Sequence, residues 1–146
     1  MQRSSFEVRT SRRVETVDIT REVQSRLPRS TNGIAVVYSP HTTTAIAINE
    51  GADPDVKTDI EETLSRLFPS GGAYRHIEGN SDAHLKSVLI GPSEIVPVEN
   101  GKLLLGRWQS IFLCEFDGPR TRTVSVSMLT AGKPLPADRR RGGEAV

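Results

Sequence analysis

The dipeptide Asn100-Gly101 constrains the fold of this chain more than any other local feature. It lies between two short segments with strand-forming residues, 94–98 and 102–105. Asn and Gly readily adopt the positive φ angles of a type I′ turn, and this turn joins neighbouring antiparallel strands. We therefore predict a tight β-hairpin at this point.

Further strands are predicted on both sides of this hairpin. Residues 108–116 and 121–129 alternate apolar and polar side chains, and the sequence Asp-Gly-Pro-Arg between them favours a turn. Near the start, residues 5–10 and 14–18 also alternate, which predicts a hairpin of two edge strands. Residues 33–38 and 42–49 are two more strands, interrupted at Pro40.

Three helices are predicted from apolar periodicity and end signals. Residues 19–27 carry apolar side chains at four-residue spacing before Pro28, and Asp18 or Thr20 would cap this helix. The Asp53-Pro54 pair starts an amphipathic helix that ends near residue 68. Asp82 is the expected N-cap of a short third helix that Gly91-Pro92 ends.

Length and charge limit the kinds of protein this chain can be. With 146 residues and a net charge of +1, it is expected to form one domain, spanning 1–132, followed by a disordered tail at 133–146. This charge argues against a nucleic-acid partner, and no apolar run suits a membrane span or a signal peptide. We predict a cytoplasmic protein. Its single cysteine, Cys114, is expected to be a packed thiol rather than a nucleophile.

All three histidines lie between residues 39 and 84. His41 follows Pro40 at the strand break, His76 lies in a long Gly-containing loop, and His84 falls in the first turn of the third helix. Neutral imidazole is a common ligand of zinc, and Asp, Glu, Asn or Thr neighbours could orient each ring. The alternative is three separate, hydrogen-bonded surface histidines, and the spacing alone does not decide between the two.

Several other polar residues allow either a functional or a structural interpretation. Glu115, Asp117 and Arg120 end a strand and would form an ion-pair cluster or a subunit contact. Lys86 could reach a phosphate or belong to a solvated helix face. Trp108 with Gln109 could be the wall of a pocket or part of the core. The chain has no Walker-type glycine loop, nucleophile elbow or dinucleotide fingerprint.

Several motifs together resemble the YjbQ-like family. They follow one another in order over nearly the whole chain before the tail: Ser-Pro-His-Thr-Thr-Thr-Ala at 39–45, Asn-Glu-Gly-Ala-Asp-Pro-Asp-Val at 49–56, Tyr-Arg-His at 74–76, Asp-Ala-His-Leu-Lys at 82–86, Pro-Val-Glu-Asn-Gly-Lys-Leu at 97–103, Trp-Gln at 108–109 and Glu-Phe-Asp-Gly-Pro-Arg at 115–120. Arg107 departs from the family, which commonly has a small Thr at this position.

The resemblance implies an α+β fold: a single compact domain with an antiparallel β-sheet or sandwich and two or three helices, usually assembled as a homotrimer. Members of the family are described as secondary thiamine-phosphate synthases. That reaction joins a pyrimidine diphosphate to a thiazole phosphate and releases pyrophosphate, so the site must stabilise negative charge on the leaving group. The implied partner is thus a small phosphorylated molecule.

Residues and resemblance together lead to one site hypothesis. We expect His41, His76 and His84 to hold a divalent metal, zinc first and magnesium as the alternative for the diphosphate. Catalytic roles are assigned to Glu50, Glu78, Asp82 and Lys86. Substrate contacts are assigned to Thr42, Thr43, Asn49, Trp108, Gln109 and Arg120. Two alternatives stay open: a non-catalytic trimeric module that binds a phosphorylated molecule or a metal, and a metal-assisted phosphohydrolase.

Overall fold

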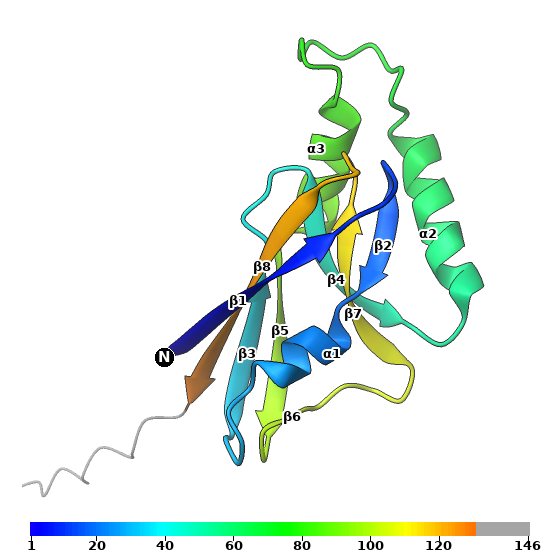
Figure 1. Cartoon of the computed structure of the whole chain (residues 1–146). Helices are drawn as coiled ribbons and strands as arrows, with labels where there is room; N and C mark the ends of the chain where they lie inside the picture. The colour runs from blue at the N-terminus through cyan, green and yellow to red at the C-terminus, as the bar shows by residue number, and fades with distance from the viewer. Residues whose placement is uncertain (131–146) are drawn as a thin grey trace, which may run out of the picture.

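The computed structural model describes residues 1–130 (Figure 1). The predicted tail at 133–146, and the last two residues of the predicted domain, lie outside the described residues. In chain order the elements are β1 (Gln2–Arg9), β2 (Glu15–Asp18), α1 (Thr20–Ser25), β3 (Gly33–Tyr38), β4 (Thr44–Glu50), α2 (Pro54–Leu67), α3 (Ser81–Ile90), β5 (Ser93–Glu99), β6 (Lys102–Leu103), β7 (Gln109–Glu115) and β8 (Thr121–Thr130).

Two antiparallel sheets form the framework. One has the strand order β1-β8-β3-β5-β6 and the other the order β2-β7-β4. With three helices packed on these sheets, the predicted α+β domain is confirmed. Among residues 1–130, no helix has the length and apolar character needed to cross a bilayer.

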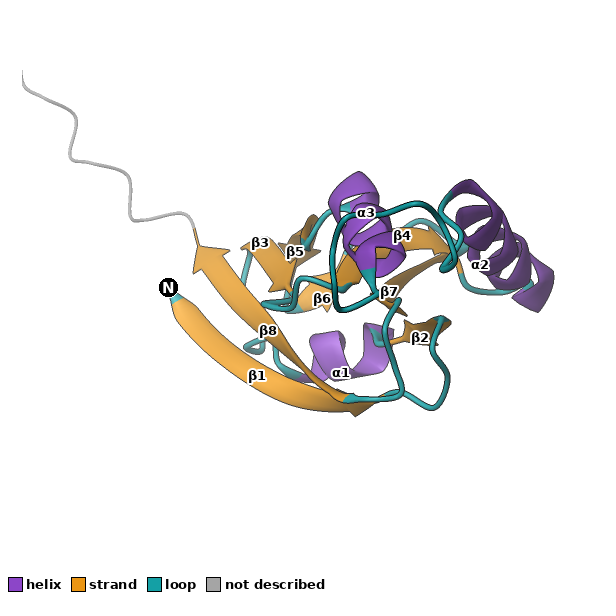
Figure 2. Ribbon diagram, turned by 90° about the horizontal axis from the view of Figure 1, so that it is seen from above, coloured by secondary structure: helices purple, strands orange, loops and turns teal. Residues whose placement is uncertain are grey.

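The three-stranded sheet lies between two hydrophobic clusters. On one face, Ile46 and Leu113 pack with α1 and the five-stranded sheet in the main core. On the other face, Ala45 and Cys114 pack with residues of α2 and α3 in a smaller cluster. Figure 2 shows α1 beside the curve of β1 and β8, with α2 and α3 on the far side of β4 and β7. Burial on both faces explains why the middle residues of these strands, 45–48 in β4 and 111–114 in β7, are all apolar.

The β5–β6 hairpin is the one that Asn100-Gly101 predicts. The φ angles of these residues are 52° and 74°, so both are positive as a type I′ turn requires. The predicted N-terminal hairpin is wrong, although both of its strands are edge strands. β1 pairs with β8 and β2 pairs with β7, in different sheets. The backbone of Thr10 bonds to Arg120 and not to β2, which directs the chain from one sheet into the other.

The helix starts are largely as predicted. Asp53 caps α2 by accepting a hydrogen bond from the backbone of Asp55 at 2.9 Å, with Pro54 in the first turn. At α1 the predicted cap is wrong: Ile19 is the N-cap and makes no side-chain capping bond, while Asp18 before it accepts a hydrogen bond from the backbone of Thr20 at 2.9 Å. The third helix differs by two residues: α3 begins at Ser81, and Asp82 is a buried first-turn residue rather than its N-cap. Burial of Asp82 places its carboxylate against Arg13 and Lys86.

Candidate functional site

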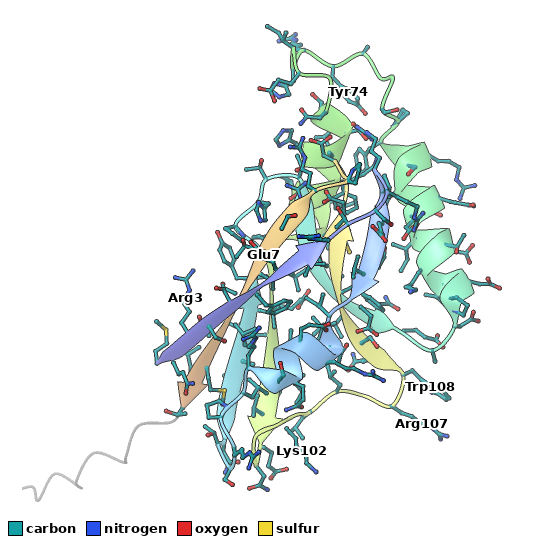
Figure 3. All side chains as sticks on the ribbon, in the orientation of Figure 1. Arg3, Glu7, Tyr74, Lys102, Arg107 and Trp108 are labelled. Carbon is teal, nitrogen blue, oxygen red and sulfur yellow. The ribbon has the colours of Figure 1, made fainter. Side chains whose placement is uncertain are left out.

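Two of the three histidines meet at the start of α3. The rings of His76 and His84 pack edge to face, with centroids 5.4 Å apart. His76 comes from the loop between α2 and α3, and its Nε2 lies 3.6 Å from a carboxylate oxygen of Glu78. The two rings line a pocket of about 460 Å³ whose lining residues are Tyr74, Arg75, His76, Ser81, His84 and Leu85. Figure 3 shows Tyr74 at this end of the molecule.

The lining of this histidine pocket contains an arginine and two imidazoles but no carboxylate. Guanidinium and imidazole N–H groups donate hydrogen bonds to anions, and the first amides of a helix do the same. The N-cap Asn80 makes no side-chain hydrogen bond to those amides. Most of the surface that lines the pocket is apolar, and these N–H groups are the donors available to an anion, with the Glu78 carboxylate 3.6 Å from Nε2 of His76.

A buried charge network holds α3 below this pocket. The Asp82 carboxylate accepts two hydrogen bonds from the Arg13 guanidinium and one from the Lys86 ammonium, each at 2.9 Å. Both Asp82 and Lys86 are almost completely buried. Burial by itself raises the pKa of Asp82, but the hydrogen bonds from Arg13 and Lys86 outweigh it and lower this pKa to about 2. Lys86 is thus committed to Asp82 and neither residue lines the pocket.

His41 lies apart from the other two histidines, in the loop between β3 and β4, and it does not line the histidine pocket. Its Nε2 accepts a hydrogen bond from the backbone N–H of Thr123 at 2.8 Å. Burial, and then the charge of Arg122, lower the pKa of His41 against the opposing charge of Glu115. With Nε2 as an acceptor, the neutral ring carries its proton on Nδ1.

Beside His41 is a second buried ion pair. The Arg122 guanidinium donates to both carboxylate oxygens of Glu115, at 2.7 and 2.6 Å, and to the Thr43 hydroxyl at 2.8 Å. Glu115 also accepts hydrogen bonds from Thr10 and from two backbone amides. The Glu115 carboxylate is therefore fully engaged by donors of the protein itself. In this arrangement Glu115 and Thr43 have a structural role.

The predicted ion-pair cluster of Glu115, Asp117 and Arg120 is divided into two pairs. Arg120 pairs with Asp117 at 3.0 Å, and Asn80 donates a further 3.0 Å hydrogen bond to that carboxylate. Glu115 pairs with Arg122 instead. Because Asn80 precedes α3, the Asp117 contact links the β7–β8 turn to the helix start that carries His84.

Other predicted site residues lie far from the histidine pocket. Asn49 and Glu50 are at the far end of β4 from His41, and this seven-residue strand spans roughly 20 Å. Glu50 is opposite Gln109 in the sheet, and Gln109 uses its side chain to accept a hydrogen bond from Gly106. Figure 3 shows Trp108 and Arg107 at the opposite end of the molecule from Tyr74. The Arg107 guanidinium lies 4.9 Å from the centre of the exposed Trp108 ring. Thr42 is exposed in the His41 loop.

Within residues 1–130, no group of three or more His, Cys, Asp or Glu side chains is arranged to hold a metal ion. The His76–His84 pair would supply two ligands and would need others from outside this set. The structure of one chain thus gives no support to a three-histidine metal pocket, and a zinc or magnesium ion stays a prediction. Cys114 is buried as expected, and burial raises the pKa of its thiol to about 12.

Sequence reasoning missed Arg13, Arg75 and Arg122. Arg122 had a detectable signal, because it shares the inward face of β8 with Val124, Val126 and Met128, all of which are buried. A charged residue at a core-facing position of an alternating strand implies a buried partner. Arg13 had no such signal, since its partner lies 69 residues away along the chain.

Comparisons with known proteins agree with this fold. A family model described as UPF0047 protein YjbQ-like matches residues 4–131. The UPF0047 protein YugU of Bacillus subtilis is 49% identical over 128 residues, covering 86% of this chain and 97% of that protein. A UPF0047 protein of Methanocaldococcus jannaschii is 50% identical over 126 residues, covering 85% and 91%.

Solved structures give the same result. A YjbQ/UPF0047 protein of Clostridium acetobutylicum has a TM-score of 0.84 and 48% identity, covering 86% of this chain and 99% of that one. A hypothetical protein of Aeropyrum pernix has a TM-score of 0.85 and 43% identity, covering 90% and 100%. The names of these four relatives carry no reaction, substrate or metal, so thiamine-phosphate synthesis stays a prediction. At this identity and coverage, the chain belongs to the YjbQ-like UPF0047 family.

Proposed function

We propose that this protein acts on a small phosphorylated molecule, whose phosphate group binds in the histidine pocket. The observation that carries the proposal is the lining itself: Arg75, His76 and His84 converge at the start of α3 with no carboxylate among them. Arg guanidinium and imidazole N–H groups are donors of the kind that bind phosphate oxygens. The pocket volume is within the usual range for small-molecule sites.

The reaction we propose is the one implied by the family resemblance, the formation of thiamine phosphate. Pyrophosphate is its leaving group, and negative charge grows on the departing oxygen. Arg75 would stabilise this charge, and an imidazolium at His76 or His84 would donate a proton to it. Asp82 and Lys86 act in this proposal as positioning residues, because they fix the first turns of α3 and touch no ligand.

The histidine pocket supplies only part of the ligand set that a divalent ion needs. His76 and His84 would be two of its ligands, and residues 1–130 arrange no third His, Cys, Asp or Glu side chain with them to complete the coordination. We therefore derive no step through a metal. The metal-assisted phosphohydrolase, which needs a complete centre, is for the same reason not favoured over the phosphate-binding proposal.

One observation favours the non-catalytic alternative, a module that binds a phosphorylated molecule without converting it. Asp82 and Glu78 are the two carboxylates near the pocket that could act as a general base. Asp82 is hydrogen-bonded to two cationic side chains and is buried. Glu78 alone is then available, and its side chain is 75% exposed. A side chain so exposed is not fixed in place by packing, whereas general-base catalysis needs a positioned group.

We also propose self-association, for which the homotrimer of related proteins is the expected form. The outer face of the five-stranded sheet carries Ile34, Tyr38, Ile95 and Leu129, all exposed. The register places Ile34 opposite Leu129, and Val36 opposite Ile95, so these side chains share one surface. An apolar sheet face of this kind commonly marks a protein interface.

Product formation from the two phosphorylated precursors tests the proposed reaction. We expect thiamine phosphate to form slowly with the wild type and to be undetectable with His84→Gln, while Arg21→Gln on exposed α1 serves as a control. If the wild type gives no product above a heat-killed sample, with and without added magnesium or zinc, the reaction is rejected. Phosphate binding by the same sample then separates the binding module from a protein with no phosphate site.

A further inference from the structure

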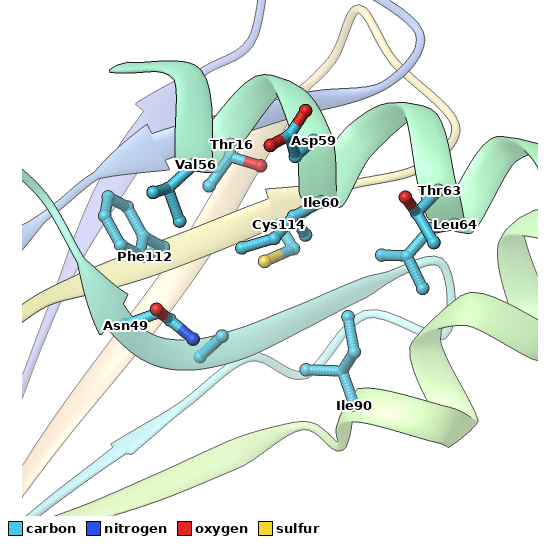
Figure 4. A pocket seen from close by; sticks show the side chains of 11 residues that line it. Thr16, Asn49, Val56, Asp59, Ile60, Thr63, Leu64, Ile90, Phe112 and Cys114 are labelled. Atoms are coloured by element: carbon cyan, nitrogen blue, oxygen red, sulfur yellow. The ribbon is translucent and has the colours of Figure 1, made fainter. Parts of the chain in front are cut away.

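A second pocket lies between α2 and the three-stranded sheet, at a different place from the histidine pocket (Figure 4). Its volume is about 510 Å³. The lining residues come from β2, β4, α2, α3 and β7: Thr16, Ala47, Asn49, Val56, Asp59, Ile60, Thr63, Leu64, Ile90, Phe112 and Cys114. None of them lines the histidine pocket.

The pocket exists because α2 does not pack closely on the sheet. Val56, Ile60 and Leu64 form the apolar face of this helix, yet Leu64 is the only buried residue among its fourteen. The pocket is a groove open to solvent between α2 and the sheet, with apolar side chains of both elements along it. A space of this size under an amphipathic helix is of the kind that proteins keep for a ligand.

The walls and the ends of this α2 pocket differ in chemistry. Ala47, Ile60, Ile90 and Phe112 make apolar walls. Asn49 lies at the Phe112 end in Figure 4. Its Oδ1 accepts a hydrogen bond from the backbone N–H of Glu50 at 2.7 Å. Asn49 is exposed and its NH₂ group has no hydrogen-bond partner among residues 1–130, so it is a donor at the open side of the pocket that a ligand acceptor can reach.

The charged residues at the α2 pocket restrict the charge that a ligand can carry. Asp59 is the one ionisable carboxylate among the lining residues, and no cation pairs with it in the described part of the chain. Its charge disfavours an anionic ligand, although the Lys57 ammonium lies 6.0 Å from the centre of the Phe112 ring, and the apolar walls disfavour burial of any charge. A phosphorylated molecule therefore suits the histidine pocket and not this one.

We propose that the α2 pocket binds a small, neutral, ring-containing molecule with a single polar group, a hydrogen-bond acceptor that faces the Asn49 amide. The ring lies against Phe112 and under Ile60, where it completes the packing that α2 lacks. This assigns Asn49 to a site of its own. The proposal does not depend on the phosphate-binding function of the histidine pocket.

Acetophenone is a suitable probe, since it joins a flat ring to one acceptor. Its titration into the full chain is followed through the methyl NMR signals of Ile60, Leu64 and Ile90, with the exposed Ile95 as the reference. We expect saturable shifts of the three lining methyls at a 1:1 ratio. Ala47→Phe, which fills the pocket from β4, should abolish them, and the exposed Ala52→Phe should not. Ala47→Leu is a milder filling variant in case Ala47→Phe does not fold.

Three results would overturn the proposal. The first is the absence of shifts in the wild type up to the solubility limit of acetophenone, and the second is their persistence in the folded filling variant. The third is movement of the same methyl signals with protein concentration alone, which would mean that a second copy of the chain covers the pocket.

The role of Asn49 has its own test. Asn49→Ala should weaken acetophenone binding about fivefold, the effect of one lost hydrogen bond. It should leave unchanged the binding of α-methylstyrene, which has the same shape without the acceptor. Equal effects on both probes would contradict the proposed orientation.

Discussion

The Nε2 atom of His41 lies 2.8 Å from the backbone nitrogen of Thr123 and accepts its hydrogen bond. This contact ties the loop between β3 and β4 to β8, in a part of the molecule where Arg122 and Glu115 are buried. It also determines which nitrogen of His41 is a donor. In this arrangement the ring offers an N–H group at Nδ1 and not a lone pair, which suits an anion better than a metal ion.

We predict from this contact that neutral His41 is the Nδ1–H tautomer and that its pKa lies below 6.5. Burial and the positive charge of Arg122 both disfavour the imidazolium. Nitrogen-15 NMR of the ring, followed over pH 4–8 with His76 and His84 as internal comparisons, measures both properties. A proton on Nε2, or a pKa above 6.5, would contradict the prediction.

Asp82→Asn is expected to destabilise the fold by about 3 kcal/mol, because it leaves the buried Lys86 ammonium without a compensating charge. Urea unfolding measures the change in the free energy of unfolding. Glu7→Gln, an exposed change of the same charge on β1, is the matched control and should alter stability by no more than about 0.5 kcal/mol. Equal effects of the two variants would show that the Asp82 network contributes no more than a surface charge.

The lowered pKa of Asp82 also predicts an acid-sensitive contribution to stability. A carboxyl with a pKa near 4 in the unfolded chain and about 2 in the folded chain stabilises the fold above pH 4. This stabilisation, about 2 kcal/mol, is lost as the pH falls from about 4 to about 2. The free energy of unfolding of Asp82→Asn, compared with wild type over this range, should converge with it toward low pH. A constant difference between the two proteins would refute the assignment.

Ile95→Glu is expected to weaken self-association, because it puts a charge in the centre of the exposed apolar face of the five-stranded sheet. Light scattering after size-exclusion chromatography should show a trimer for the wild type and smaller species for the variant. Val88→Glu, on the exposed side of α3, is the control for a nonspecific effect of charge. An unchanged mass for Ile95→Glu would place the interface elsewhere.

Local sequence signals predicted much of the framework around the site. Asp53-Pro54 begins α2 and Asn100-Gly101 forms the β5–β6 turn, because in each case the conformation is decided by neighbouring residues. The break at Pro40 likewise separates β3 from β4 and leaves His41 in a loop. The start of α3 was less well predicted, because Asp82, a good capping residue, is used instead as a buried partner of Arg13 and Lys86.

Features that depend on long-range contacts were not predictable from the chain alone. The alternation of β1 and β2 is the same whether they pair with each other or with β8 and β7, so the sequence pattern could not exclude a hairpin. The same limit applies to the site. His76 and His84 are close in the sequence and meet, whereas Asn49 and Trp108, which were assigned to the same site, lie at the other end of the fold.

The proposed function requires that the histidine pocket binds phosphate through its own side chains. Isothermal titration calorimetry with pyrophosphate, in buffer containing EDTA, tests this most directly. We predict 1:1 binding by the wild type and by Arg21→Gln, and binding weakened about tenfold by Arg75→Gln, the loss of one charged hydrogen-bonding group. Absence of binding by the wild type, or equal affinity of Arg75→Gln and the wild type, would contradict a phosphate site at this pocket.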